Sequence, residues 1–430
     1  MAQPMASLLA SFDSVLLITS VVKIIFLTFL VIMPMVAYSV YAERRFSAVI
    51  QDRVGPNRVG IPLTLFGLKK DIQIFGIGGL VQPLADGLKF FLKEDFTPRT
   101  VNTFYFWLAP CLTIVPALMT CAVLPFGSEL DLSFLGLAQP VKAVIADLNV
   151  GPLFVFAIAS LGVYGIVIAG WSSNSKYPFL GGVRSSAQMI SYEISLGLSI
   201  VPVLMIFGEL NLSKMSAFQD AHGWLLLPLW GEGLSLERWV LLVPIVISFC
   251  VFVVAMFAET NRLPFDMAEC ETELVAGYHT EYSSMKFALF FMGEYAAMII
   301  GSGMAVTMFL GGWSIPFWPV FEKIGLLLGL DHLLAWLGTS YWTGWLLAPL
   351  QLDVFQFHYT AGDTPLWLGL LHIATFFAKI VVFILFFILI RWSLPRFRFD
   401  QLMKLGWLFM FEIALANVVL TALILIAFNR

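Results

Sequence analysis

Several carboxylates interrupt otherwise apolar stretches, and they are the side chains best suited to chemistry. Glu193, Glu259 and Glu294 each lie within or at the end of a long apolar run. A charge at the centre of a bilayer costs about 2.5 to 3.5 kcal/mol on insertion scales, so a carboxylate there indicates a function by default. Shielded carboxyl groups that lie close together can hold and pass protons near neutral pH. These acids favour proton movement, with structural pairing to a basic neighbour as the alternative.

A second set of acids lies in the loop at residues 263–285, which follows Arg262. The set comprises Asp266, Glu269, Glu271, Glu273 and Glu281. Pro264 is placed to open a helix, and the spacing predicts Asp266, Glu269 and Glu273 on one face of that helix. The acids extend the same proton-handling pattern, although a solvated surface that faces a partner protein would have the same composition.

The elements that must position these acids are membrane helices. Of the 430 residues, 60% are hydrophobic and 12% are charged, whereas soluble domains carry about a quarter charged residues. A bilayer-spanning helix takes about 20 apolar residues. The expected fold is an all-α, polytopic transmembrane bundle in a single membrane domain, 1–430, and the apolar windows predict eight spans, at about 17–42, 104–126, 151–170, 187–207, 239–262, 286–310, 366–390 and 405–427.

The loops alternate in basic residues, which predicts how the chain is oriented. Most of the 24 Lys and Arg residues fall after the first, third, fifth and seventh predicted spans. Positively charged loops stay cytoplasmic, so both termini are expected on the outer side. Residues 311–365, rich in Trp and Pro, are then expected to form an external interfacial insertion.

The longest basic loop, at residues 43–103, contains an amphipathic pattern. Apolar residues repeat at helical spacing on one side, whereas Asp86, Lys89 and Lys93 share a polar stripe. Pro83 lies near the helix start. This pattern predicts an amphipathic helix on the membrane surface, and a weaker pattern indicates a shorter one near residues 65–75. Simple anchoring to anionic lipid is the alternative explanation.

Two further ionisable residues fall within the last two predicted spans. Lys379 lies midway along the seventh span, and Glu412 lies in the eighth. Because consecutive spans are antiparallel and the two residues have similar expected depths, a structural ion pair between them is the favoured interpretation.

No metal or nucleotide site is indicated by the sequence. The four cysteines form no CxxC pair and the five histidines lack ligand spacing. No glycine-rich nucleotide fingerprint follows a predicted strand, and nothing points to nucleic acid as a partner. If redox chemistry involves this chain, the electrons are expected to come from a partner.

At these acidic and basic segments the chain resembles the family of H subunits of bacterial NADH-quinone oxidoreductase, the counterpart of mitochondrial complex I subunit 1. The resemblance runs through AERRFSAVIQDRVGPNRVG (42–60), GLVQPLADGLKFFLKED (79–95), IAGWSSNSKYPFLGGVRSSAQMISYEISLGL (168–198), AETNRLPFDMAECETELVAGYHTEYSSMKFALFFMGEY (258–295) and LPRFRFDQLMKLGW (394–407). The sequence departs from the family where Ser284 replaces a common glycine, Lys286 an arginine and Glu412 a proline.

The resemblance implies a membrane subunit of a proton-translocating NADH-quinone oxidoreductase in the inner membrane of a bacterium. Such a protein anchors a soluble arm and lines a tunnel for quinone, which is the substrate, while FMN and iron-sulfur clusters belong to partner subunits and none is bound by this chain. The resemblance assigns quinone binding to Glu43, Arg44 and Asp86. It assigns the proton-coupling path to Glu193, Glu259, Glu269, Glu271, Glu273 and Glu294. Other membrane subunits and lipid are the remaining expected partners.

Two other functions compete with this assignment. A membrane subunit of a hydrogenase- or ferredoxin-linked proton-pumping complex would share the acids without necessarily binding quinone, and Arg44 and Asp86 favour the quinone assignment. A free-standing secondary transporter would be expected to show internal repeats, and none is evident between the two halves of the sequence.

Overall fold

The computed structural model describes residues 14–57, 59, 79–131, 140–228, 236–267, 271–318 and 366–428, without the side chains of 14–18, 271 and 272. In these ranges the chain is 75% helical and contains two short strands. The elements in order are α2 (Ser14–Ile25), η1 (Phe26–Ile32), α3 (Met33–Ile50), α4 (Gln82–Leu92), α5 (Thr103–Thr120), η3 (Cys121–Val123), β1 (Glu129–Leu130), β2 (Val141–Lys142), α6 (Gly151–Ala159), α7 (Leu161–Ser172), α8 (Lys176–Phe207), α9 (Leu212–His222), α10 (Leu236–Glu259), α11 (Glu271–Leu274), η5 (Gly277–His279), α12 (Ser284–Phe309), α16 (Leu366–Ser393), α17 (Phe399–Lys404), η8 (Leu405–Met410) and α18 (Phe411–Ala427).

Within the described residues, eight helical segments are long and apolar enough to cross a membrane. Each of the eight predicted spans overlaps one of these segments, and the all-α fold is confirmed. Two helix boundaries differ from the predicted ones in ways that change the positions of functional residues. The first span continues to Ile50, so Glu43 and Arg44 lie on α3 rather than in a loop. The fourth span begins at Lys176, well before the predicted position near 187, because polar residues are tolerated on a helix that packs inside the protein.

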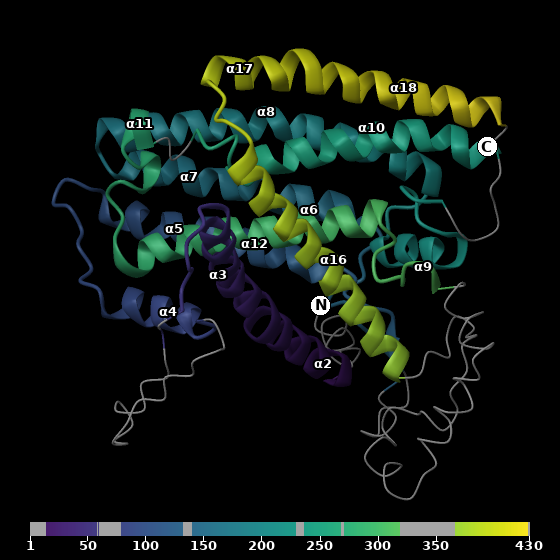
Figure 1. Cartoon of the computed structure of the whole chain (residues 1–430), viewed down its shortest axis with the longest axis horizontal. Helices are drawn as coiled ribbons and strands as arrows, with labels where there is room; N and C mark the ends of the chain where they lie inside the picture. Colours follow the sequence, from purple (N-terminus) through teal and green to yellow (C-terminus); the bar gives the residue numbers. More distant parts are fainter. Residues whose placement is uncertain are drawn as a thin grey trace, which may run out of the picture.

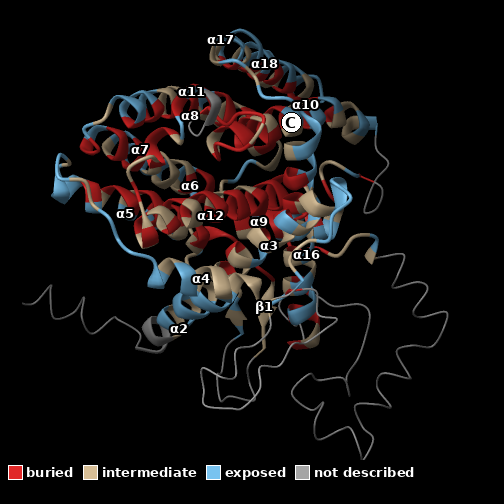
Figure 2. Cartoon of the chain, turned by 60° about the vertical axis from the view of Figure 1, so that its left-hand side comes forward, coloured by how far each residue is buried: buried red, intermediate tan, exposed pale blue. Residues whose placement is uncertain are grey.

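The helices pack in layers around α12, the most buried of the membrane spans. Helix α5 packs against α7 and α12, and α8 packs against α10 and α18. Helix α16 crosses the bundle obliquely and contacts α12 and α3 (Figure 1). Burial follows this arrangement, since α12 is largely buried whereas α4 and α18 expose much of their surface (Figure 2).

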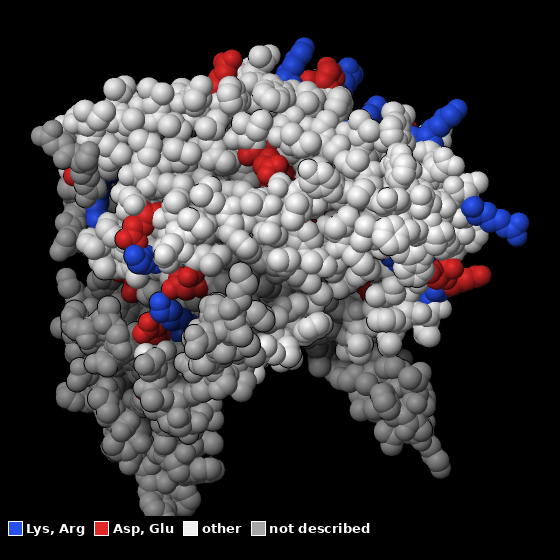
Figure 3. Space-filling model, turned by 180° about the vertical axis from the view of Figure 1, so that it is seen from behind, with Lys and Arg blue, Asp and Glu red and all other residues white. Residues whose placement is uncertain are grey.

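The two ends of the bundle differ in their elements. One end, here called the basic end, carries the carboxyl end of α3, the helices α4, α11 and α17, and the start of α12. The opposite end carries α9 and the end of α18 (Figure 1). It also carries a short antiparallel hairpin, in which β1 pairs with β2 in the register Glu129 to Lys142. Seen from behind, the surface between the ends carries few charged side chains (Figure 3), as a bilayer-facing surface requires.

Three predictions concern residues outside the described ranges. They are the short amphipathic helix near residues 65–75, most of the 311–365 insertion, and Glu269. The stronger amphipathic helix is present as α4, and its apolar side chains Leu84, Leu88 and Phe91 are exposed.

Candidate functional site

Glu43 forms the centre of a buried charged cluster at the basic end of the bundle. Its carboxylate is ion-paired with Arg391 of α16 and accepts a hydrogen bond from the Tyr295 hydroxyl of α12. Arg262, which follows α10, places one guanidinium nitrogen 3.8 Å from the same carboxylate. The guanidinium also lies over the Tyr295 ring, 3.9 Å from its centroid. Charges this buried are stable only when paired, and Glu43 joins three of the membrane spans.

Arg262 connects this cluster to Glu294. A second guanidinium nitrogen of Arg262 lies 4.0 Å from a Glu294 carboxylate oxygen. The Tyr278 hydroxyl donates a hydrogen bond of 2.8 Å to the other oxygen of Glu294. Glu294 and Tyr295 are adjacent on α12 and therefore point in different directions. Arg262 is thus shared by two carboxylates, Glu43 and Glu294, that approach it from different sides.

The turn that carries Arg262 is held in place by α8. Gln188 donates hydrogen bonds of 2.6 Å to the Ala258 carbonyl and 2.8 Å to the Phe265 carbonyl. Within the turn Asn261 has φ of +49°, a conformation that asparagine adopts more readily than most residues. Its side-chain oxygen accepts a hydrogen bond from Ser185. These buried bonds fix the end of α10, and with it the positions of Glu259 and Arg262.

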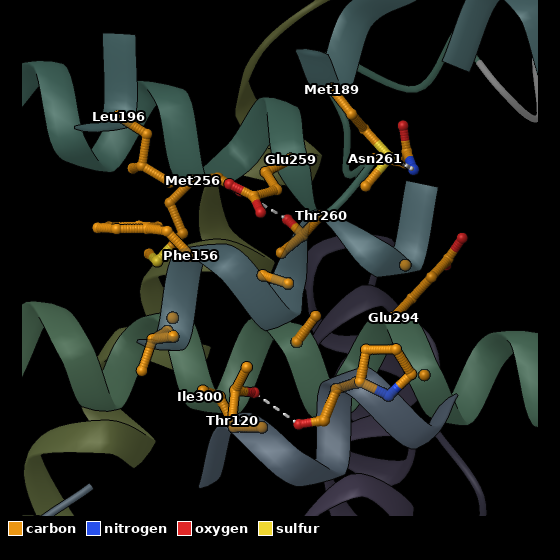
Figure 4. A pocket seen from close by; sticks show the side chains of 18 of the residues that line it. Thr120, Phe156, Met189, Leu196, Met256, Glu259, Thr260, Asn261, Glu294 and Ile300 are labelled. Carbon is orange, nitrogen blue, oxygen red and sulfur yellow. Dashed lines mark hydrogen bonds between the residues drawn. The ribbon is translucent and has the colours of Figure 1, made fainter. Parts of the chain in front are cut away.

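A cavity of about 100 Å³ lies inside the membrane-spanning region next to this turn. Helices α5, α6, α7, α8, α10 and α12 all contribute to its mostly apolar wall. Its polar lining residues are Thr113, Thr120, Glu259, Thr260, Asn261 and Glu294. Glu259 comes from the end of α10 and Glu294 from α12, and in Figure 4 the carboxylate of Glu294 points away from Glu259. The cavity therefore brings together two of the acids that the sequence singled out.

Glu259 has an incompletely bonded carboxylate in this region. Its Oε2 atom is buried and has no hydrogen-bond partner among the described residues. The Glu193 carboxylate of α8 is close enough to repel it electrostatically. Glu193 itself is only half-buried and does not line the cavity. A buried carboxylate oxygen without a partner is unusual, and it marks the cavity as a place where protonation can change.

Two of the three residues assigned to quinone binding meet each other. Arg44 of α3 forms an ion pair of 2.7 Å with Asp86 of α4. Gln82 donates a hydrogen bond of 3.0 Å to the other Asp86 oxygen. This pair ties α4 to the end of the first span at the surface of the chain. The third residue, Glu43, is on the same helix as Arg44 but points inward into the charged cluster.

The acidic loop does not form the helix that the sequence predicts. Pro264 lies in a turn, and the described part of this loop before α12 contains only the four-residue α11, Glu271–Leu274, and the 3-10 turn η5. Asp266 is buried and pairs with Arg396 at 3.1 Å, whereas Glu273 is exposed and pairs with Arg184 at 2.6 Å. The prediction that these acids share one helical face is therefore wrong. Glu271 begins α11, and Glu269 lies outside the described residues.

His279 follows Tyr278 in η5 and is buried among aromatic side chains. Its ring packs against Tyr278 and against Phe287, Phe290 and Phe291 of α12. Burial lowers the pKa of His279 to about 3. The imidazole therefore stays neutral and packs among these aromatic rings.

The two departures at the start of α12 have structural explanations. Ser284 has φ of +52°, in the left-handed region that favours glycine. Its hydroxyl donates a hydrogen bond to the Phe90 carbonyl of α4. Lys286 is buried and reaches the Thr97 hydroxyl at 2.7 Å and Asp95 at 3.1 Å. Ser284 thus attaches α4, and Lys286 attaches the loop between α4 and α5, to the start of α12.

The predicted ion pair between Lys379 and Glu412 is wrong. Lys379 donates hydrogen bonds of 2.7 to 2.8 Å to the carbonyls of Leu310, Gly312 and Ser314, and its amine lies 4.0 Å from the Trp224 ring centroid. Helix α16 packs on α12 and α3, whereas α18 packs on α8 and α10. Consecutive spans need not be neighbours, so two residues at similar depth in the membrane need not be in contact.

In the described ranges, no group of three or more His, Cys, Asp or Glu residues could hold a metal ion. The expectation that the chain binds no cofactor of its own stays a prediction. Sequence reasoning missed the two phenols, Tyr278 and Tyr295. Both lie within the acidic motif at 258–295, but no spacing rule connects Tyr295 to Glu43, which is distant in the sequence.

The fold and this site together define a polytopic membrane protein with a buried network of acids and arginines. The comparisons with known proteins identify the class more closely. The family described as NADH dehydrogenase matches residues 22–422. The NADH-quinone oxidoreductase H subunit of Flavobacterium psychrophilum is 39% identical over 97% of this chain and 100% of its own length.

Other relatives of the same name match nearly as much of the chain. The H subunit of Salinibacter ruber is 41% identical over 91% of both chains, and that of Leptospira biflexa is 41% identical over 92% of this chain and 91% of its own. This chain belongs to the family of NADH-quinone oxidoreductase H subunits. It is therefore a multi-pass membrane subunit of an NADH-quinone oxidoreductase complex and is not catalytic alone.

Proposed function

We propose that this subunit forms, with its soluble partners, the entry passage and chamber for quinone, and that it contains the first part of the path coupling quinone reduction to proton translocation. The single observation that carries this proposal is the sharing of Arg262. One guanidinium lies between Glu43, on the side of α3 and α16, and Glu294, which lines the internal cavity. A charge change on one side is thereby felt on the other.

The quinone part of the proposal is supported by the surroundings of α4. Arg44 and Asp86 pair at the surface, beside the exposed apolar side chains Leu84, Leu88 and Phe91. An isoprenoid tail requires an apolar route, and a quinone head group requires hydrogen-bond donors, which arginine supplies. Reduction of the head group takes two electrons from a partner's iron-sulfur cluster and two protons.

The coupling part of the proposal is supported by the cavity. A volume of about 100 Å³ is large enough for several water molecules, which need polar partners such as Glu259, Glu294 and Thr260. Protons or charge displacements would pass from Glu43 through Arg262 and Glu294 to Glu259 and then to Glu193. The acids of the 263–285 loop, including Glu271 and Glu273, would set the negative potential at the entrance to this path.

The orientation follows from the charge distribution. With the basic end in the bacterial cytoplasm, the soluble arm that carries FMN and the iron-sulfur clusters would dock on α4, α11 and the loop before α17. The antiporter-like membrane subunits would then receive the coupled protons or charges from the side of Glu193.

Substitution of Asp86 by Asn tests the quinone assignment. D86N replaces the carboxylate by a neutral amide and weakens the pairing with Arg44, which at this exposed position is worth about 0.2 to 1 kcal/mol, so D86N is expected to lower NADH-quinone reduction by up to about fivefold. Oxidation of NADH by an artificial acceptor, which needs only the soluble arm, should be unchanged. The matched control is K89Q, also on α4, which should retain both activities.

Equal loss of both activities in D86N would mean that Asp86 serves assembly instead. A photoreactive quinone provides a second readout, because it should label α4 or α3 in the parent complex. Absence of any label on this subunit would contradict the quinone assignment.

A further inference from the structure

Glu412 is a carboxylate in the middle of the last membrane span. The helical segment runs from Phe399 to Ala427, and Glu412 lies about 20 Å from its start at 1.5 Å per residue. It is neither a member of the cluster around Arg262 nor a lining residue of the internal cavity. No role in the proposed coupling path explains its presence.

The side chain of Glu412 faces away from the rest of the chain. Helix α18 packs on α8 and α10 through Ala414, Asn417, Thr421 and Leu425, which are buried. Residues at the complementary positions are exposed, namely Glu412, Ala416, Val419 and Leu423. The two sets repeat at helical spacing on opposite sides of the helix. Figure 1 shows α18 at the outer edge of the bundle.

The described part of the chain provides no partner for this carboxylate. Among the described residues Glu412 has neither an ion pair nor a hydrogen bond. Lys379 of α16, the candidate that the sequence suggested, instead donates to three backbone carbonyls in the turn after α12. Facing lipid, a carboxylate at this depth would be strongly unfavourable, and intramembrane acids accordingly face protein or water.

We propose that the outward face of α18 is a docking surface for a transmembrane helix of another subunit, and that this helix carries a lysine or arginine that pairs with Glu412. Charge complementarity selects this occupant, because a cationic side chain neutralises the carboxylate within the membrane. The small side chain of Ala416, one turn along, allows the partner backbone to approach closely. The inference rests on membership of a multi-subunit membrane complex and does not depend on the quinone or proton assignments.

Photo-crosslinking in the intact complex tests the docking surface. A benzophenone amino acid is placed at position 412 and, as the matched control, at Val382, which is 65% exposed midway along α16. The expected result is a crosslink from position 412 to one polypeptide, at a membrane segment with a Lys or Arg at similar depth. Only lipid adducts at position 412 would overturn the proposal.

Charge reversal tests the nature of the partner. E412K places like charges together and should reduce the amount of assembled complex in native gels at least tenfold, while E412Q, which leaves the partner's base unpaired, should reduce it less. V382K controls for the cost of inserting a lysine into the membrane. Parental assembly of E412K, or an equal loss in V382K, would show that no cationic partner helix is present.

Discussion

Arg262 is the residue on which the charged network depends. Its guanidinium lies 3.8 Å from Glu43 and 4.0 Å from Glu294, and both distances are longer than a direct hydrogen bond. If Glu43 accepts a proton, Glu43 no longer competes for Arg262, so the ion pair of Arg262 with Glu294 becomes stronger. Protonation of Glu294 likewise strengthens the ion pair of Arg262 with Glu43. Such a shared cation gives a physical basis for reciprocal coupling between two sites.

At the same scale, His279 gives the protein a defined response to acid. Burial lowers the pKa of His279 to about 3, below its ordinary value of about 6.5. The unfolded chain therefore binds a proton that the folded chain excludes, and stability is lost as pH falls from about 6.5 toward 3. From pH 7 to pH 5 this linkage lowers the free energy of unfolding by about 2 kcal/mol.

The variant H279F removes the titrating group and keeps an aromatic ring. Its thermal inactivation midpoint should fall less between pH 7 and pH 5 than that of the parent complex. An equal fall in both proteins would show that His279 is protonated in the fold or does not limit stability.

The types of residue at the site were predictable from the sequence, but their pairings were not. A carboxylate within a predicted membrane span is rare because its charge is costly in the bilayer. Glu193, Glu259 and Glu294 could therefore be selected without a structure. The ion pair of Arg44 with Asp86 and the contact of Tyr295 with Glu43 join residues that lie far apart in the sequence. No periodicity within a single helix reports such contacts.

At the scale of elements, the approach of α8 to η5 positions Tyr278 against Glu294. A Cβ atom added to Gly181 would lie 2.7 Å from the Gly277 Cα atom and 2.8 Å from the Tyr278 nitrogen. Both are backbone atoms that cannot move independently of η5. We expect G181A to displace η5, because overpacking of this kind costs about 1 to 3 kcal/mol.

The measurement is the thermal midpoint together with NADH-quinone activity, and both should fall in G181A. Gly197, on the same helix, has open space around its added Cβ atom. G197A should therefore be neutral or stabilising by about 0.5 to 1 kcal/mol. Indistinguishable behaviour of the two variants would mean that the close contact has no consequence.

The turn after α12 is a second element whose geometry depends on one side chain. Lys379 donates to the carbonyls of Leu310, Gly312 and Ser314, and a buried carbonyl left without a donor costs about 1 to 3 kcal/mol. K379M should lower the thermal midpoint of the complex by about 4 °C or more. K404M, at an exposed lysine of α17, is the control and should leave it unchanged.

Helix positions were well predicted, whereas turns were not, and the difference is physical. Apolar runs of about 20 residues have only one stable conformation in a bilayer, which is why all eight spans were found. Pro264 is compatible with both a helix start and a turn. The bonds from Gln188 to Ala258 and Phe265 select the turn, and they come from another part of the chain.

At the scale of the whole molecule, the proposed coupling path joins ionisable groups that come from several helices of the bundle. It begins with Glu43 at the basic end, passes through Arg262 and Glu294, and reaches the internal cavity with Glu259, next to Glu193. The wall of the cavity is otherwise mostly apolar. In such low-dielectric surroundings, a change of charge on one group has a large electrostatic effect on neighbouring groups.

Proton translocation per electron in sealed vesicles tests this account most directly. E259Q and E294Q replace the cavity carboxylates by amides that cannot exchange a proton, while E209Q, at an exposed ion pair with Lys214, is the control. Both cavity variants are expected to lose most of the proton translocation that accompanies quinone reduction, whereas E209Q should keep it. Parental proton translocation in both E259Q and E294Q would contradict this account.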